Sequence, residues 1–492
     1  MKPGTLLAAI AAIIGLFVLL GSYSASADEV TTIDAGGGYG PTCAVVSGGQ
    51  MWCWGDNDSG QLGIGVTGGG AHSRPTKVCS NAACSAHLMG VAHIAVGVKH
   101  TCAVLSDSSL MCWGANDSGA LGIGTMGGSS TIPVSVCADS ACTAHLQNVK
   151  VVSASGALGP TCAVTTGGGV KCWGHNFYGA VGDGTTSHRT APVDVTGLTS
   201  GVVTVAAAKE HTCALTTAGG VKCWGNPNQG RLGNGESGCC PARTAQDVVG
   251  LGSGVQAIDA FHSHSCALTS GGGVKCWGFN GTGQLGDGTR DNIRSTPIDV
   301  VGLSSGVMAI ALGSRHSCAL TTAGGMKCWG SNRDGQLGDG TTTERDSPVD
   351  VQGLSSGVTA ITAGDSSTCA LLDDGSAKCW GNNVRGQLGN GETTGRTSPV
   401  AVVDLKSSLT PTQTPLRTPT RTPTPCLPNG DANDDGVVNS IDAALVLQHS
   451  AGLVSSLPCE ESADVNHDGN INAVDAAIIL QYVAGLIDDL PN

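Results

Sequence analysis

Short apolar runs alternate with glycine-rich and polar segments along most of this chain. One representative stretch has a β-prone run at 202–207, a second at 213–217 and a third at 221–224. Runs of this length around a Gly-containing turn predict short antiparallel strands, the second and third forming a hairpin. A proline-started run such as 192–195 adds a fourth strand, because proline is tolerated at the first residue of a strand. Each unit therefore predicts a four-stranded sheet.

This unit occurs seven times. Every copy contains Cys-Ala-(Leu/Val) followed by Cys-Trp-Gly, and successive copies start 51 to 60 residues apart. A sheet of about 50 residues cannot bury its own faces, whereas sheets arranged radially around an axis cover one another. Seven copies predict a mainly β protein with a seven-bladed β-propeller. The repeated tryptophans, which we expect between blades, are Trp54, Trp113, Trp173, Trp224, Trp277, Trp329 and Trp380.

The composition agrees with this architecture. The 492 residues include 76 Gly and only 13% charged residues, a balance typical of many turns and short strands. The net charge of -14 argues against a nucleic-acid partner, because binding to a phosphate backbone needs patches of Lys and Arg. A negative net charge suits a cation partner instead.

Residues 1–27 have the features of an export signal. Lys2 precedes an apolar stretch at 6–20, and Ala25-Ser26-Ala27 forms a small-residue cleavage site. The alternative is an uncleaved membrane anchor, although the apolar run is short for a span. We therefore expect a secreted or cell-surface associated protein, with a membrane contact only through this segment if it is uncleaved.

The cysteine spacing indicates one disulfide per blade. Nine residues separate the two cysteines of each hairpin, so a three-residue turn such as 217–219 places Cys213 opposite Cys223. Reduced core cysteines and a metal site are the alternatives; a metal site needs two pairs to converge, whereas these pairs are distributed one per blade. The seven expected pairs are Cys43 with Cys53, Cys102 with Cys112, Cys162 with Cys172, Cys213 with Cys223, Cys266 with Cys276, Cys318 with Cys328, and Cys369 with Cys379.

The remaining eight cysteines also fall into pairs along the chain: Cys79 with Cys84, Cys137 with Cys142, Cys239 with Cys240, and Cys426 with Cys459. The first two pairs occupy matching insertions of the first two units. The adjacent third pair allows either a vicinal bridge or two separate partners, and the pairing of the fourth is also open. Because none is left over, the case for a catalytic thiol is weak.

The sequence contains no recognisable arrangement of catalytic residues. We find no paired-carboxylate pattern, nucleophile elbow or phosphate loop, and we expect no enzymatic activity. His100, His211, His264 and His316 recur two positions before the first cysteine of four units, which indicates a structural hydrogen-bonding position. Three aromatic residues outside the repeated tryptophans, Trp52, Phe177 and Tyr178, are candidates for a partner surface.

Residues 406–425 form a Pro/Thr-rich segment that favours extended conformations and reads as a linker. Two calcium-type loops follow it, in register 33 residues apart. Each fills positions 1, 3, 5, 7, 9 and 12 with oxygen ligands, the seventh through its backbone carbonyl, and has Gly at position 6. We expect two Ca²⁺ sites. The ligands are Asp431, Asn433, Asp435, Val437, Asn439 and Asp442 in the first loop, and Asp464, Asn466, Asp468, Asn470, Asn472 and Asp475 in the second.

These loops are not complete EF-hands. Pro425 and Pro428 stand where an entering helix would lie, and position 12 is Asp rather than Glu. Each loop leads only into an exiting helix, at 442–448 and 475–481. Because the last repeat ends near 405, the sequence divides into signal 1–27, propeller 28–405, linker 406–425 and C-terminal module 426–492.

The repeat resembles the regulator-of-chromosome-condensation repeat, over roughly residues 31 to 405. A good copy pairs His316-Ser-Cys-Ala-Leu320 with Trp329-Gly-Ser-Asn-Arg-Asp-Gly-Gln-Leu-Gly-Asp-Gly340. The resemblance implies a seven-bladed propeller. The eukaryotic namesake exchanges guanine nucleotides on a nuclear GTPase, a target that an exported, acidic chain does not meet. Bacterial relatives include a secreted β-lactamase inhibitor, which implies that the ring can serve as a binding platform.

The duplicated loop and helix resemble a type I dockerin. This resemblance implies calcium-dependent binding to a cohesin-like protein through one of two near-symmetric faces. The chain differs from the common pattern, which has Ser-Thr in the loop and Lys-Arg on the helix. The implied recognition positions are Ser440, Ile441, Leu447 and Gln448 in the first half, and Ala473, Val474, Leu480 and Gln481 in the second.

Three functional hypotheses follow from these patterns. The first is a scaffold-attached or surface-attached binding protein whose propeller displays a site for an unknown protein or glycan ligand. The second is an accessory component of an extracellular polysaccharide-degrading (O-glycosyl hydrolase) assembly, since dockerins commonly tether glycosidases. The third, a hydrolytic propeller, needs acidic residues clustered on one face of the ring.

Overall fold

The computed structural model describes residues 29–37, 40–155, 159–238, 240–290 and 292–405, and in the C-terminal region residues 438, 443, 446–447, 449–450, 463–465 and 470–483. The chain divides into two compact units, Met1–Leu409 and Thr410–Asn492. The expected signal at 1–27 and the linker at 406–425 lie outside the described residues. Among the described residues, no helix is long and apolar enough to cross a membrane.

The first unit is a seven-bladed propeller, as the repeat predicts. Seven four-stranded antiparallel sheets follow one another, each built from consecutive strands. Blades one to three contain β1 (Val30–Ala35), β2 (Thr42–Val46), β3 (Gln50–Gly55), β4 (His72–Lys77); β5 (Val91–Val96), β6 (His100–Leu105), β7 (Leu110–Ala115), β8 (Ser129–Ser135); and β9 (Val149–Ala154), β10 (Pro160–Thr165), β11 (Val170–Gly174), β12 (Arg189–Asp194).

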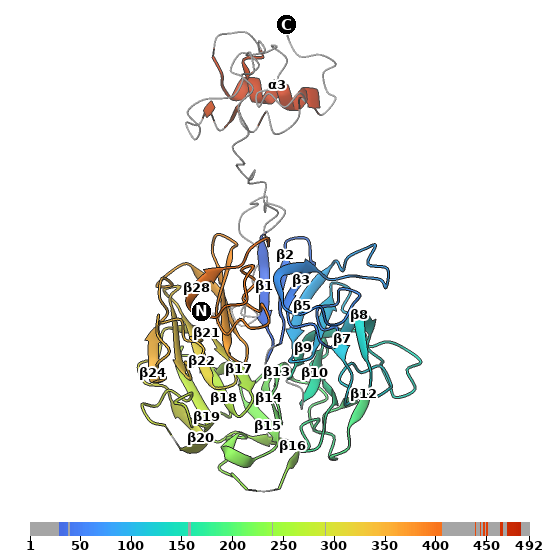
Figure 1. The fold of residues 1–492 in the computed structure, drawn as a ribbon, viewed down its shortest axis with the longest axis vertical. Coiled ribbons are helices and arrows are strands. Elements are labelled where there is room, and N and C mark those ends of the chain that lie inside the picture. The colour runs from blue at the N-terminus through green and yellow to red at the C-terminus, as the bar shows by residue number, and fades with distance from the viewer. Residues whose placement is uncertain are drawn as a thin grey trace, which may run out of the picture. The chain divides into compact units, whose positions relative to one another are not determined.

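Blades four to seven continue around the ring, from green to orange in Figure 1. They contain β13 (Val202–Ala207), β14 (His211–Thr216), β15 (Val221–Gly225), η1 (Asn228–Gly230), β16 (Ala242–Asp247); β17 (Val255–Phe261), β18 (His264–Thr269), β19 (Val274–Phe279), β20 (Ile293–Asp299); β21 (Val307–Leu312), β22 (His316–Thr321), β23 (Met326–Gly330), β24 (Arg345–Asp350); and β25 (Val358–Ala363), β26 (Ser367–Leu372), β27 (Ala377–Gly381), β28 (Arg396–Ala401).

The central hairpin of each blade has the register that its turn dictates. In blade four the Thr216 carbonyl accepts the Gly219 amide, and Cys213 lies directly opposite Cys223. Gly225, after the Cys-Trp pair, has a positive φ of 111° where the pairing to the outer strand shifts. Glycine adopts that conformation without strain.

This register allows a disulfide across the hairpin of every blade, with the two Cα atoms 4.1 Å apart in each. The cysteines therefore act as cross-strand bridges in the structure, and none of the fourteen is left as a thiol or a metal ligand. The bridges join Cys43 to Cys53, Cys102 to Cys112, Cys162 to Cys172, Cys213 to Cys223, Cys266 to Cys276, Cys318 to Cys328, and Cys369 to Cys379.

Two of the other expected cysteine pairs are also bridged. Disulfides join Cys79 to Cys84 in blade one and Cys137 to Cys142 in blade two. Cys239, Cys426 and Cys459 lie outside the described residues.

The core lies between blades rather than within them. Trp277 of blade five is fully buried among apolar residues of blade four, and its indole Nε1 donates to the Arg231 carbonyl at 2.9 Å. The other six repeated tryptophans donate to the preceding blade in the same way. Each tryptophan therefore packs against and hydrogen-bonds to the preceding blade. Neighbouring blades in this way bury each other's faces.

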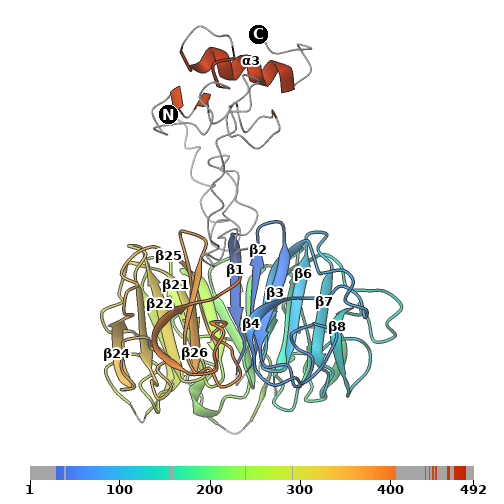
Figure 2. The ribbon, with the colours of Figure 1, turned by 45° about the horizontal axis from the view of Figure 1, so that its top comes forward.

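The ring closes without a strand shared between its ends, because β1 to β4 and β25 to β28 form separate sheets. Blades one and seven lie side by side, and β1 lies on the inside of the ring in both views (Figure 1, Figure 2). At this seam Thr362 donates to the Asp34 carboxylate at 3.0 Å and Trp54 donates to the Gln387 carbonyl at 2.9 Å. Side chains and packing therefore close the circle.

The second unit has one long helix among its described residues, α3 (Ala473–Val483). Its buried apolar residues pair across the sequence duplication: Ala443 corresponds to Ala476, and Val446 corresponds to Ile479. All four belong to one core cluster, so the two halves of the module bury equivalent positions against each other.

Candidate functional site

The recurring histidines form hydrogen-bond chains between blades. Ser317 donates its hydroxyl proton to the Gln284 carbonyl at 2.9 Å, so its oxygen accepts from Nε2 of His264, also at 2.9 Å. Burial lowers the pKa of His264 to about 3, which keeps the ring neutral. Equivalent contacts join His100 to Thr161, His211 to Ser265, and His316 to Thr368. The structural interpretation of these histidines is confirmed.

The inner strands surround a central channel of about 310 Å³ that is lined by two half-buried carboxylates. Asp34 accepts the Val96 amide of the next blade at 2.8 Å, and Asp259 accepts the Leu312 amide at 2.8 Å. Burial raises the pKa of Asp34 to about 6 and that of Asp259 to about 7, against the lowering effect of these hydrogen bonds. Both carboxylates therefore bridge adjacent inner strands.

Trp52 is not an exposed aromatic residue, which corrects its place among the surface candidates. Its ring packs partly against the core between blades seven and one. The Lys77 ammonium lies 5.0 Å from the ring centroid, on the strand paired with that of Trp52. In blade three the corresponding cross-strand pair is Lys171 with Asp194. Blade one thus replaces an ion pair with a cation–π contact.

Four ring side chains gather in the loop between β11 and β12 of blade three. His175 and His188 stack with centroids 4.7 Å apart, and Phe177 meets Tyr178 edge to face at 5.1 Å. Asn176 lies between His175 and Phe177 in the sequence, and its backbone amide donates to Nδ1 of His188 at 2.9 Å. The Phe177 side chain is 63% exposed. Of the three sequence candidates, the Phe177-Tyr178 pair therefore remains at the surface.

His188 also lines a groove of about 500 Å³. One wall of the groove is residues 138–140 of the blade-two insertion, and the other is β12 with Lys171. The cysteine pair of this insertion was predictable from the sequence, but the groove was not. It arises because the insertion of one blade reaches the outer strand of the next.

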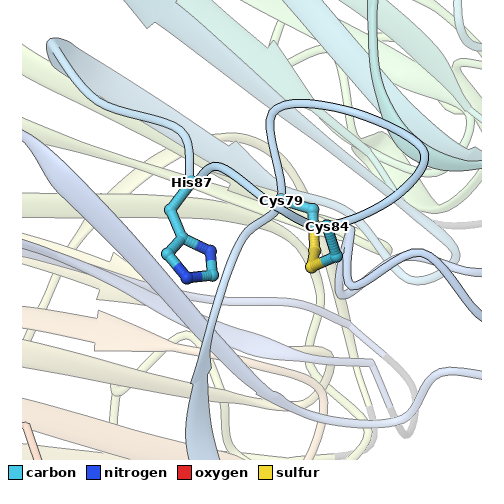
Figure 3. Close-up of side chains that lie close together, drawn as sticks. All are labelled: Cys79, Cys84 and His87. Carbon is cyan, nitrogen blue, oxygen red and sulfur yellow. A yellow bond between two sulfur atoms is a disulfide. The ribbon is translucent and has the colours of Figure 1, made fainter.

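The corresponding insertion of blade one places a histidine beside its cysteine pair (Figure 3). One ligand atom from each of Cys79, Cys84 and His87 lies within 4.8 Å of the others. The two sulfurs are joined in a disulfide, so the imidazole is the only free donor of the three and the set does not suit a metal. The pattern Cys-x4-Cys-x2-His also occurs in blade two, a signal that sequence reasoning missed.

The second calcium-type loop leads directly into α3. The carboxylate of Asp475 is fully buried and accepts the Asn472 amide at 2.9 Å, while the Asn472 side chain donates to the Asn470 carbonyl at 3.0 Å. Positions 7, 9 and 12 thus bring hard oxygen donors together, a donor set that fits Ca²⁺. Asp464 is also described. The first-loop ligands, together with Asn466 and Asp468, lie outside the described residues.

One face of α3 is exposed and carries the expected recognition residues. Val474 is 55% exposed and Leu480 is 42% exposed, while Ile479 on the other side is buried. Leu447, the counterpart of Leu480 in the first half, is also 42% exposed. Ala473 and Gln481 are exposed as well. Ser440, Ile441 and Gln448 lie outside the described residues.

The sequence matches the RCC1-like domain over residues 50–414, and a regulator of chromosome condensation (RCC1) repeat over residues 30–61. The chain belongs to the RCC1-like family. Residues 429–484 match the dockerin type I domain. The RCC1-like propeller is thus joined in one chain to a type I dockerin, a domain class that binds calcium. Both families are generally non-catalytic binding modules.

Relatives of the RCC1-like domain have varied roles. The ultraviolet-B receptor UVR8 of Arabidopsis thaliana is 30% identical over 387 residues, covering 76% of this chain and 83% of the receptor. The human E3 ubiquitin-protein ligase HERC2 is 33% identical over 313 residues, covering 62% of this chain but only 6% of HERC2. The structure of Prp20p from Saccharomyces cerevisiae has a TM-score of 0.61 at 23% identity, covering 73% of this chain and 87% of Prp20p.

Proposed function

We propose that this chain is an exported, non-catalytic binding protein. Its RCC1-like propeller serves as an interaction platform, and its dockerin attaches it to a cohesin-like partner in a calcium-dependent manner. The observation that carries this proposal is the exposed apolar face of α3 beside a loop of oxygen donors. A face with Val474 and Leu480 exposed is unfavourable in water and suits a protein interface.

Calcium supplies the link between loop and face. Asp475 occupies position 12 of the second loop and is also in the first turn of α3. A Ca²⁺ ion at this loop would neutralise a buried carboxylate and hold the start of the helix in place. By the sequence pattern the first loop does the same through Asp442. Two sites and two equivalent faces are thus part of the proposal.

The non-catalytic assignment is supported by how the propeller uses its polar residues. The repeated histidines bond to hydroxyls of the next blade, and Asp34 and Asp259 accept backbone amides. Groups that are engaged in holding blades together are poorly placed to meet a substrate. Secretion fits the disulfide in every blade, since disulfides persist in oxidising compartments.

A second candidate function is that of an accessory component in an extracellular polysaccharide-degrading assembly. It shares the dockerin attachment and adds a glycan ligand for the ring. The specific observation in its favour is the Phe177-Tyr178 pair, with Phe177 exposed, in the same loop as His188, which lines a groove.

The attachment is tested with the full chain and an immobilised recombinant type I cohesin. We expect binding in Ca²⁺ and none in excess chelator. Asp442→Ala with Asp475→Ala should abolish binding, whereas either single change should weaken it less because the other face remains. Asp117→Ala, an exposed propeller carboxylate, is the matched control and should bind normally. Binding that persists in chelator or in the double variant would contradict the proposal.

A further inference from the structure

The seven blades provide an internal comparison for the aromatic loop of blade three. In every blade the segment after Trp-Gly closes the same turn, with an amide of the loop bonded to the carbonyl of the residue three earlier. At the position of Phe177 the other blades have Asp58, Asp117, Asn228, Gly281, Arg333 and Val384. At the position of Tyr178 they have Ser59, Ser118, Gln229, Thr282, Asp334 and Arg385. The turn therefore does not require aromatic rings.

A second departure from the repeat lies on the adjoining blade. The disulfide-closed insertion between Cys137 and Cys142 occurs in blade two, with a counterpart in blade one alone. It supplies one wall of the 500 Å³ groove, and His188 of the aromatic loop lies in the opposite wall. The blade-two insertion thus faces one residue of the aromatic loop across the groove.

Both cations of this groove are already paired with carboxylates, and its remaining carboxylate is held by neutral donors. Lys171 donates to Asp194 at 2.7 Å, and Arg189 donates to Asp183. Asp139 accepts the Ala141 amide at 2.9 Å and the Thr143 hydroxyl at 3.1 Å. Because both cations are neutralised by carboxylates and Asp139 is held by hydrogen bonds, the groove does not favour a strongly charged ligand. It favours a neutral ligand with many hydroxyl groups, for which ion pairs and carboxylates provide donors and acceptors.

The aromatic rings beside the groove indicate that the neutral ligand is a sugar. A pyranose ring presents a flat face of C–H groups that packs on an aromatic face, while its edge is lined with hydroxyls. Phe177 is exposed and meets Tyr178 edge to face, and the backbone amide of the preceding Asn176 donates to His188, which stacks with His175 and lines the groove. A groove of this volume is within the range of small-ligand sites.

We propose that this surface, made by the blade-three aromatic loop, β12 and the blade-two insertion, binds a neutral glycan chain. One sugar packs on Phe177 and Tyr178, and adjoining sugars lie along the groove from His188 to Asp194. The inference deepens the proposed platform role and rests on it, because it assigns the ring a ligand that the dockerin would bring to an attached assembly.

The experiment measures retardation of the full chain in native gels containing xylan, galactomannan or hydroxyethyl cellulose. We expect retardation by at least one polysaccharide, little changed by added salt because the ligand is uncharged. Phe177→Ala with Tyr178→Ala should weaken it about tenfold, the loss expected when about 1.4 kcal/mol of contact is removed. Asp139→Asn, on the opposite wall, should weaken it about threefold.

Val384→Ala is the matched control. Val384 is the exposed apolar residue at the Phe177 position of blade seven, 55% exposed and remote from the groove, so its loss should leave retardation unchanged. The inference is overturned if no gel retards the wild-type chain, if the double variant is retarded normally, or if Val384→Ala loses as much. Cohesin binding measured on the same samples separates the two proposals: normal cohesin binding without retardation overturns only the glycan site.

Discussion

Two titratable residues in the interior of the ring have opposite effects on the pH dependence of stability. His264 has a folded-state pKa of about 3 against 6.5 normally, so the unfolded chain binds more protons between these values. Its contribution to stability is complete above about pH 6.5 and is lost as the pH falls toward 3. Asp259 has a pKa of about 7 against 3.8. Here the folded chain holds the extra proton, and stability is lost as the pH rises from 3.8 to 7.

Replacing Asp259 with Asn should therefore stabilise the propeller at alkaline pH. The Asn side chain has one acceptor oxygen, so it keeps one of the two backbone amides, Leu312 on Oδ2 and Ala260 on Oδ1, that bond to Asp259, and it has no charge to desolvate. We expect the gain in thermal midpoint to grow from about pH 4 to pH 7 and to level off above that. Thermal unfolding at a series of pH values measures this. The exposed Asp117→Asn should show no such trend, and a gain independent of pH would contradict the prediction.

At the scale of elements, the disulfides divide into protected and accessible classes. Both sulfurs of every hairpin disulfide are fully buried between blades. In the two insertions one sulfur of each pair is reachable, because Cys84 is half-buried and Cys142 is exposed. A thiolate must contact a sulfur to open the bond. Burial by neighbouring blades therefore determines which bridges a reductant can attack.

Mild reduction of the folded protein should open the two insertion disulfides first. Alkylation and peptide mass mapping should label Cys79, Cys84, Cys137 and Cys142, and leave the fourteen hairpin cysteines unlabelled until denaturant is added. Removing a hairpin bridge, as in Cys213→Ser with Cys223→Ser, should then lower the free energy of unfolding by about 2–3 kcal/mol. Labelling of hairpin cysteines at the same rate as Cys84 would contradict this order.

For the whole molecule, the seam between blades one and seven is the one blade junction of the described ring that no chain segment crosses. Its contacts resemble those at other junctions: Thr362 accepts the Ala35 amide at 3.2 Å, much as Ser153 accepts the Ala207 amide at 2.9 Å. At the junction of Ser153, between blades three and four, the backbone also runs from one blade into the next. The seam depends on side chains and packing, including the Arg74–Asp404 ion pair.

Thr362→Val should therefore open the ring at its seam. The substitution keeps the shape but removes the hydroxyl from the Ala35 amide and the Asp34 carboxylate, at a cost of about 1–2 kcal/mol. Hydrogen exchange should accelerate in β1 and β25 before other strands. Ser153→Ala is the control and should not produce this local pattern. Equal acceleration in all blades would show that the ring unfolds only as a unit.

Much of this architecture follows from the sequence alone. A three-residue turn fixes which residues face each other in a hairpin, so the pairing of Cys213 with Cys223 is a consequence of spacing. Seven copies of a sheet too small to bury itself require a ring. The prediction of the calcium-type loops rests on equally local patterns, because all six ligand positions lie within twelve residues; of the two expected exiting helices, the described residues include α3.

The contacts between blades were decided only by the tertiary structure. The Thr42 hydroxyl bonds to the Gln387 carbonyl 345 positions away, a partner that no local pattern specifies. The same holds for the histidine–hydroxyl pairs, for the burial of Trp52, and for the groove where an insertion of one blade meets the aromatic loop of the next. Turn geometry determines a pairing within ten residues, whereas these contacts exist only after the ring has closed and set neighbouring blades side by side.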